Sequence, residues 1–328
     1  MELDGFRDYL QERGQDEDKI SESISTIHNL ENLLQEQTTG QELHCATSDE
    51  IDALIKKMVD NRTNSYDNFV ALARYLYYYK NMETYLLVLT LLDGSNVMDV
   101  LYEKLGEAIG DELRDEIFKD METPPLGTPS YEKMSFTHRI MTRLEEIADK
   151  ETRESVLEQV CHGLPKDFRK GERQKYSEAG NLDEYLRRKR AADLEQLGKH
   201  RDEGTLFFNQ EITDDVLEFI RQRPDILTGE RRGNKIYHTK IPYMTKEYLA
   251  ETDERMKRYY ACHCAWTRGS IKTDDINISP TFCYCSAGFT KQSWESALGQ
   301  PLEAEMVKSV LKGDLECSFL IHLPEEVL

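Results

Sequence analysis

Four of the seven cysteines in the chain lie within residues 262–285, where they form two Cys-x-Cys pairs. The first pair is Cys262 and Cys264, in CHCAWTR, and the second is Cys283 and Cys285, in FCYC. Residues two apart on a β-strand point to the same side, so each pair would present two thiols on one face of an extended segment. Two such strands side by side would bring four sulfur atoms to a common point, and four thiolates suit tetrahedral zinc. The pairs therefore predict a zinc site carried by two adjacent strands.

Core packing is a second interpretation of these thiols. Free cysteine is among the residue types most often buried, and it packs as a small apolar side chain. Zinc modules commonly use Cys-x-x-Cys pairs, so Cys-x-Cys is the less specific signal. The grouping of four cysteines in two matched pairs nevertheless favours a metal or redox-active thiol site. His263 points to the opposite side of the predicted strand, so we do not expect it to be a ligand.

Three cysteines are candidates for a catalytic nucleophile: Cys161, Cys285 and Cys317. Cys161 continues the apolar face of a predicted helix over TRESVLEQVC, where packing is the simpler role, and Cys317 faces inward on the last predicted strand. A thiol becomes a nucleophile only when a nearby base or positive charge stabilises the thiolate. No neighbouring His, Lys or Arg has a diagnostic spacing, and the chain lacks G-x-G-x-x-G, phosphate-loop and H-E-x-x-H motifs. The sequence leaves enzymatic activity open.

Short strands and turns dominate the last third of the chain. The segment NKIYHTKIPY mixes β-branched and aromatic residues, as strands do. The segments PLEAEMVKSV and ECSFLIHLP both alternate in polarity, and a Lys-Gly-Asp turn at 312–314 lies between them. This pattern predicts an antiparallel hairpin. Between the cysteine pairs and the hairpin, SAGFTKQSWESALG predicts a helix that ends at Gly299.

Helical periodicity marks the first third of the chain. Apolar residues recur three or four apart in KISESISTIHNLENLL, TSDEIDALIKKM and NFVALARYLYYYK, which predicts amphipathic helices. Thr47 and Glu50 have the spacing of a helix capping box. Three prolines and a glycine in METPPLGTPS indicate a domain boundary. The predicted fold class is α+β, with a helical bundle over 1–122, a linker over 123–130 and a helical plus small antiparallel-sheet domain over 131–328.

Composition and charge exclude several classes of function. The chain has 328 residues and a formal net charge of −20, which argues against nucleic-acid binding because that needs clustered Lys and Arg. The longest apolar run, at 85–92, is far shorter than the ~20 residues of a membrane span. The segment MELDGFRDYL lacks the features of a secretory signal. We therefore expect a cytoplasmic protein, no membrane association, and cysteines that are reduced or bound to metal.

Residues 5–95 resemble the helical core-binding domain at the front of tyrosine recombinases. The resemblance lies in the spacing of GFRDYL, a long helix, TSDEIDALIKKM and a helix ending in aromatic residues. The chain has no H-x-x-R motif with a downstream tyrosine nucleophile, so no recombinase catalytic domain follows. The resemblance implies a helical shape with a different use, such as contact with a partner protein or a second copy of the chain.

Residues 135–328 resemble an uncharacterised microbial cysteine-rich family, and their C-terminal part is similar to L-2-amino-thiazoline-4-carboxylic acid hydrolases and to the 4-vinyl reductase type of small-molecule-binding domain. The similarity is in the ending: a strand, Gly313, then Cys317 and Phe319 on the last strand. The Cys-x-Cys pairs, Phe289 and Glu295 belong to the cysteine-rich family's own pattern. These relatives imply a compact α+β domain with a pocket for a small organic ligand, sometimes with a metal held by cysteines. They do not imply one reaction.

The leading interpretation is a cytoplasmic small-molecule-binding protein with a zinc ion held by Cys262, Cys264, Cys283 and Cys285. A neighbouring ligand pocket would be lined by Trp266, Arg268, Phe289 and Phe319. One alternative is a hydrolase that acts on a small cyclic or thiol-containing compound through a cysteine nucleophile. The other is a helical adaptor whose cysteines only pack in the core.

Overall fold

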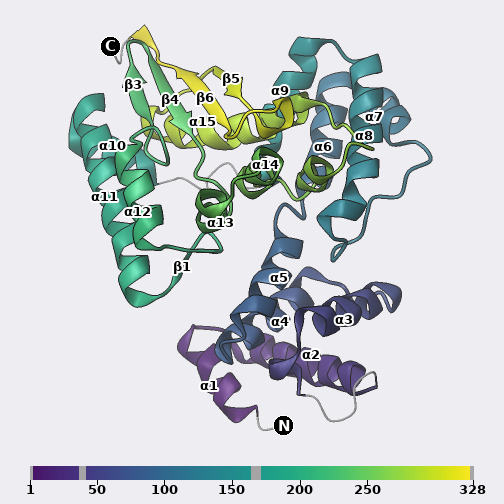
Figure 1. Cartoon of the computed structure of the whole chain (residues 1–328). Helices are drawn as coiled ribbons and strands as arrows, with labels where there is room; N and C mark the ends of the chain where they lie inside the picture. The colour runs from purple at the N-terminus through teal and green to yellow at the C-terminus, as the bar shows by residue number, and fades with distance from the viewer. Residues whose placement is uncertain (1–2, 37–41, 164–170, 326–328) are drawn as a thin grey trace. The chain divides into compact units, whose positions relative to one another are not determined.

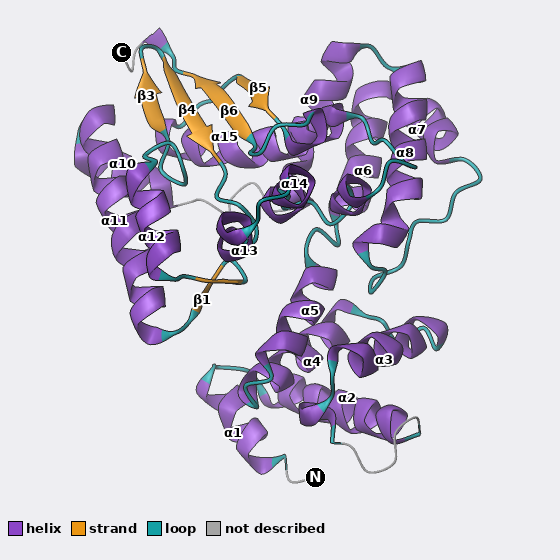
Figure 2. Ribbon diagram, viewed as in Figure 1, coloured by secondary structure: helices purple, strands orange, loops and turns teal. Residues whose placement is uncertain are grey.

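The computed structural model describes residues 3–36, 42–163 and 171–325 (Figure 1). It confirms the predicted α+β class: helices form most of the chain, and the strands form two small antiparallel sheets (Figure 2). The chain divides into two compact units. The first comprises residues 1–95 and 124–129, and the second comprises residues 96–123 and 130–328.

The first unit is a helical bundle built on amphipathic helices with capped N-termini. Thr47 and Glu50 form the predicted capping box at the start of α3, in which the Thr47 hydroxyl accepts from the Glu50 N–H. Asn64 Nδ2 donates to the Leu126 carbonyl at 2.8 Å, which ties the segment 124–129 to this unit. Its helices are α1 (Asp4–Glu12), α2 (Glu17–Gln35), η1 (Leu43–Cys45), α3 (Ser48–Asp60), α4 (Tyr66–Tyr78) and α5 (Met82–Leu92).

The boundary between the units differs from the one expected at the proline-rich segment 121–130. Helices α6 (Val97–Ile109) and α7 (Asp111–Phe118) belong to the second unit. Their apolar residues, such as Leu101 and Leu105, pack in one core with Phe136 of α8 (Ser130–Ile147). The division therefore follows this shared core, and the proline-rich loop only returns briefly to the first unit.

The second unit combines these helices with a four-stranded antiparallel sheet of order β3-β4-β6-β5. The predicted C-terminal hairpin is confirmed as β5 paired with β6, with a register irregularity between Met306 and Lys308. The strands are β3 (Glu230–Arg232), β4 (Lys235–Thr239), β5 (Ala304–Lys308) and β6 (Ser318–His322), with a separate pair β1 (Leu206–Phe207) and β2 (Gln210–Glu211).

Helix α15 (Tyr284–Leu298) covers one face of the four-stranded sheet (Figure 2). Trp294 and Ala297 of this helix share a core with Ile236, Phe319 and Ile321 of the sheet. Because α15 also packs along α9, it joins the sheet to the helical part of the unit. The remaining helices are α9 (Lys150–Val160), η2 (Cys161–Gly163), α10 (Gly171–Ala179), α11 (Leu182–Glu203), α12 (Asp214–Gln222), α13 (Thr245–Ala250), α14 (Glu254–Ala261), η3 (Arg268–Lys272), η4 (Pro280–Cys283) and η5 (Val310–Lys312).

One stretch, Met82–Ile109, is long and apolar enough to cross a membrane by length and composition alone. It comprises α5, a turn and α6, and Val88, Leu91, Leu101 and Leu105 of these helices are core residues. Core helices of soluble proteins pass the same test, so one such stretch is weak evidence for a membrane span.

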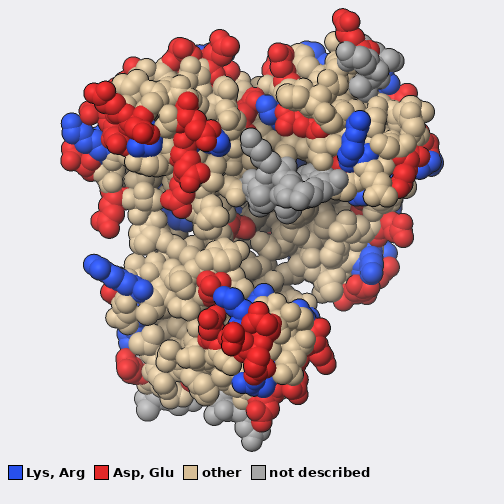
Figure 3. All heavy atoms as spheres, turned by 180° about the vertical axis from the view of Figure 1, so that it is seen from behind, with Lys and Arg blue, Asp and Glu red and all other residues tan. Residues whose placement is uncertain are grey.

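Acidic side chains are spread over the visible face of each unit in Figure 3, in keeping with the net charge of −20. Many basic side chains are paired with them. Glu184, for example, accepts from both Arg187 and Arg188 on the surface of α11. The basic run at residues 186–190 of this helix, LRRKR, is therefore partly neutralised on a solvated face.

Candidate functional site

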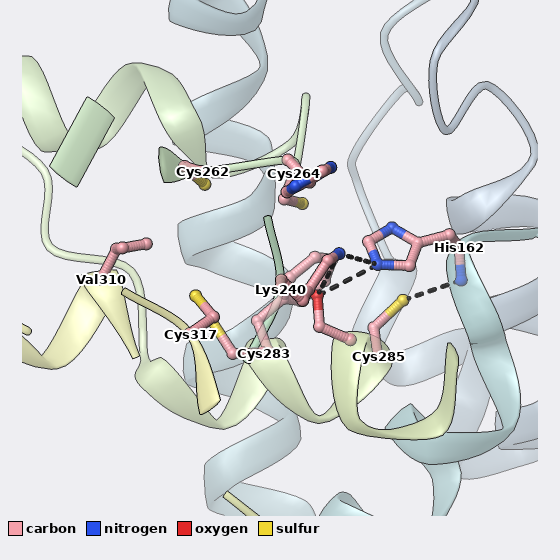
Figure 4. A pocket seen from close by; sticks show the side chains of 11 residues that line it. His162, Lys240, Cys262, Cys264, Cys283, Cys285, Val310 and Cys317 are labelled. Atoms are coloured by element: carbon pink, nitrogen blue, oxygen red, sulfur yellow. Dashed lines mark hydrogen bonds between the residues drawn. The ribbon is translucent and has the colours of Figure 1, made fainter. Parts of the chain in front are cut away.

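Five of the seven cysteines line one small cavity in the second unit, here called the cysteine cavity (Figure 4). Its volume is about 10 Å³, which is room for one water molecule or one ion. The thiols come from three separate parts of the chain, together with two imidazoles and one ammonium group. The lining residues are Cys262, Cys264, Cys283, Cys285, Cys317, His162, His263, Lys240, Ser286, Phe282 and Val310.

The prediction that each Cys-x-Cys pair lies on a strand is wrong. Cys262 follows the last residue of α14, and its N–H continues that helix by donating to Arg258. Cys264 begins a tight turn, because its carbonyl accepts from the Arg268 N–H at 2.9 Å. Cys262 and Cys264 therefore line the cavity from the segment that directly follows α14. Their sulfur atoms point into the cavity from the same side in Figure 4.

The second pair lies on consecutive helices. Cys283 is the last residue of η4, and Cys285 lies in the first turn of α15. Residues two apart on a helix differ in direction by about 200°, so these two thiols approach the cavity from different directions and have different hydrogen-bond partners. The Cys283 sulfur accepts from the Ser309 hydroxyl at 3.2 Å, and the Cys285 sulfur accepts from the His162 N–H at 3.1 Å.

The paired strands β4 and β6 bring Cys317 and Lys240 to the same end of the sheet. Thr239 is the register partner of Ser318, and their hydroxyls are 2.9 Å apart. The Lys240 N–H then donates to the Cys317 carbonyl at 3.0 Å. The Lys240 side chain reaches towards the His162 ring in Figure 4. Cys317, which we considered as a nucleophile or as pocket lining, is therefore part of the same cavity as the two pairs.

A polar group of three side chains closes one side of the cysteine cavity. His162 Nε2 is 3.0 Å from Ser286 Oγ and 3.2 Å from Lys240 Nζ. Cys161 and His162 both have left-handed backbones, with φ of 47° and 57°, a region that side chains other than glycine rarely adopt. This bend turns the His162 N–H and its ring towards the cavity.

Burial controls the charge of the cavity. It raises the pKa of Cys262 to about 12 and raises the pKa values of Cys283 and Cys317 as well. Burial lowers the pKa of Lys240, and the surrounding thiols partly offset this effect. The pKa of His162 is well below its usual value, first because of burial and then because of the Lys240 charge. At neutral pH Cys262, Cys283 and Cys317 are therefore neutral thiols, and His162 is a neutral imidazole.

A metal would fit the chemistry of these side chains, because buried thiols are the ligands that zinc and other soft ions prefer. Within residues 3–36, 42–163 and 171–325, however, no three Cys, His, Asp or Glu side chains are already grouped as metal ligands. Binding would therefore require thiol side chains to rotate towards one another. His263, which we expected on the opposite side of a strand from its neighbouring cysteines, lines the same cavity, and its Nε2 lies 2.6 Å from the Ile241 carbonyl oxygen.

The four residues expected to line a ligand pocket are not brought together at the cysteine cavity. Trp266 lies in a helical core with Phe136, and Phe319 lies in the core between the sheet and α15. Arg268 is buried with its guanidinium carbon 4.6 Å from the Tyr243 ring centre. Phe289 is adjacent to the cavity, since its ring centre is 5.1 Å from that of His162.

The remaining two cysteines lie outside the lining of the cavity. Cys161 caps the C-terminus of α9, and its thiol donates to the Glu158 carbonyl at 3.0 Å, so it is held locally. Cys45, to which the sequence assigned no role, is exposed in the first unit. Sequence reasoning missed Lys240 and Ser286, and it considered His162 only as the neighbour of Cys161 at a helix end. The CH dipeptide at the end of α9 was the only available signal for His162.

Comparison of the chain with protein-family models, with curated proteins and with solved structures gave no match. Assignment of a function therefore depends on the site itself.

Proposed function

We propose that the second unit binds one zinc ion in the cysteine cavity. The observation that carries this proposal is that five cysteines line one space large enough for a single ion. Zinc takes four ligands in structural sites. Cys262, Cys264, Cys283 and Cys285 are the proposed set, and Cys317 is a fifth thiol that could replace one of them.

The size of the cavity favours an ion over an organic ligand at this position. Pockets for small organic molecules enclose roughly 300–1,000 Å³. The cysteine cavity, at about 10 Å³, is far below that range. Binding of a small organic molecule, which the cysteine-rich resemblance implies, would therefore need a different part of the unit.

The charge around the cavity supports a thiolate-bound metal. Four thiolates and one Zn²⁺ carry a net charge of −2, which is costly to bury without a compensating charge. The Lys240 ammonium is within the lining, where it would offset one of these charges. No Asp or Glu belongs to the lining to compete for Lys240. Lys240 therefore has a specific role in the metal-bound state.

A hydrolase with a cysteine nucleophile is the alternative, favoured by the charge of Lys240, which lowers the pKa values of Cys285 and Cys317. Burial outweighs this effect and raises both pKa values overall. A neutral, buried thiol is a poor nucleophile. The zinc proposal needs no thiolate before the metal binds, because deprotonation accompanies binding.

Cobalt substitution tests the proposal. Co²⁺ added to the chelator-treated protein should give thiolate-to-metal charge transfer in the near ultraviolet and intense visible bands of a tetrahedral ion, and zinc should remove both. Cys262→Ser with Cys264→Ser should lose these bands, whereas Cys45→Ser, at an exposed thiol of the first unit, should keep them. Weak bands typical of an octahedral ion bound by oxygen would reject the site.

A further inference from the structure

We propose that a second cavity in the same unit binds a small organic anion that carries a carboxylate or phosphate group. This cavity, here called the anion cavity, has a volume of about 300 Å³, which falls within the size range of metabolite sites. It lies between α14, η3 with the loop that follows, and η5. The proposal does not depend on zinc binding.

Two arginines on one face of α14 provide the positive charge. Arg255 and Arg258 are three residues apart, so both point to the same side of the helix and both line the cavity. Arg258 donates one N–H to the Val310 carbonyl at 3.3 Å. A guanidinium has five N–H donors in a planar fork that matches carboxylate and phosphate oxygens. Ser270 and Thr273 also line the cavity, and their hydroxyls donate to the Thr267 carbonyl and to the Asp275 carboxylate.

The charge of the lining is opposite to that of the chain. The lining contains two arginines and one acid, Asp274, which makes it net positive within a chain of net charge −20. Asp274 accepts from Arg255 at 2.5 Å, but both side chains are largely exposed, at 82% and 41%. Exposed ion pairs contribute only about 0–1 kcal/mol, so an incoming anion can replace Asp274 at little cost.

The anion cavity adjoins the cysteine cavity through one residue. Val310 is fully buried and lines both. Its carbonyl accepts from Arg258 at 3.3 Å, and Cys317 lines the cysteine cavity together with it. A ligand held by Arg258 would therefore lie one residue away from the proposed metal centre, in a space where an organic molecule fits. This adjacency distinguishes the anion cavity from an incidental surface hollow.

Calorimetric titration with inorganic phosphate and, separately, with succinate tests the proposal and distinguishes the two ligand chemistries. We expect at least one probe to bind. Arg258→Ala should weaken that binding at least tenfold, and Arg258→Lys should weaken it less. Arg221→Ala removes the same charge from an exposed ion pair on α12 and should leave binding unchanged. The melting temperature of each variant shows whether it is folded.

Two results would overturn the anion cavity. One is an absence of binding by both probes up to about 10 mM, a concentration well above the range of specific metabolite sites. The other is an equal loss of binding in Arg221→Ala and Arg258→Ala, which would indicate a general effect of charge. Neither result bears on zinc, because the titrations are performed on chelator-treated protein and repeated after zinc addition.

Discussion

The backbone N–H of His162 donates to the sulfur of Cys285 across 3.1 Å, although the residues are 123 positions apart in the chain. Two consecutive left-handed residues, Cys161 and His162, are needed to aim this N–H, and such conformations cost of order 1–3 kcal/mol each. The close packing of α9 against α15 holds them in place. At Gly288 a Cβ atom would lie 1.7 Å from the Glu158 carbonyl oxygen, so the two helices touch backbone to backbone.

Gly288→Ala should therefore destabilise the second unit and disturb the cysteine cavity together. We expect a loss of about 2–4 kcal/mol in the free energy of unfolding, because backbone atoms cannot move aside as a flexible side chain can. The measurement is urea denaturation. Gly198→Ala in α11 is the matched control, since its Cβ would meet nothing within 4 Å, and it should be neutral or stabilising by about 0.5–1 kcal/mol. Equal effects of the two substitutions would contradict the close contact.

Lys240→Met should separate the stability of the metal-free protein from its affinity for zinc. The ammonium is buried beside thiols and His162, so its removal should leave the chelator-treated protein equally stable or up to about 2 kcal/mol more stable. Zinc affinity should fall at least tenfold because one compensating charge is lost. Lys246→Met, at an exposed ion pair with Glu211, is the control. Unchanged zinc affinity in Lys240→Met would show that the ammonium does not offset the thiolates.

Thiol labelling at neutral pH should give a fast phase from Cys45 and slow phases from Cys262, Cys283, Cys285 and Cys317. Cys45 is exposed, whereas burial raises the pKa values of Cys262, Cys283, Cys285 and Cys317 and keeps these thiols neutral. Cys45→Ser should remove the fast phase. If a cavity thiol reacts in this variant as fast as Cys45 does in the wild type, the result would support a cysteine nucleophile instead.

Asp225 should make the second unit less stable in acid. Burial alone would raise its pKa, but hydrogen bonds from Arg223 and Thr239 outweigh that effect, and the net pKa lies below the usual value. Since the unfolded carboxyl has a pKa of about 3.9, this contribution is complete above that pH and is lost as the pH falls through the lower folded value. Asp225→Asn should cost about 1.5–3 kcal/mol at pH 7 and flatten the acid limb of a stability-versus-pH curve. If Asp225→Asn leaves the acid limb unchanged, Asp225 is not the source of the loss of stability in acid.

The elements that the sequence predicted well are those with strong local signals. Thr47 and Glu50 form their capping box, and the alternating segments around β5 and β6 pair as a hairpin. The prediction of a strand at FCYC is wrong because it relied on the alternation of the cysteines and overlooked the helix-start signal that precedes them. Ser279 caps η4 and Pro280 occupies its first turn, a helix-start signal that was present in the sequence.

The composition of the cysteine cavity could be predicted only in part. The two cysteine pairs were identified from their spacing, yet their convergence arises from helix ends and from the β4–β6 pairing. Lys240 and His162 are 78 residues apart and meet only because tertiary packing brings strand and helix ends together. No local pattern encodes such a contact.

The zinc content of the purified protein tests the central claim most directly. Protein dialysed against zinc and then against zinc-free buffer should retain about one zinc ion per chain, as expected for a closed thiolate site. The Cys262→Ser, Cys264→Ser double variant should retain almost none, and Cys45→Ser should match the wild type. Wild-type protein that is folded and retains no zinc would contradict the account.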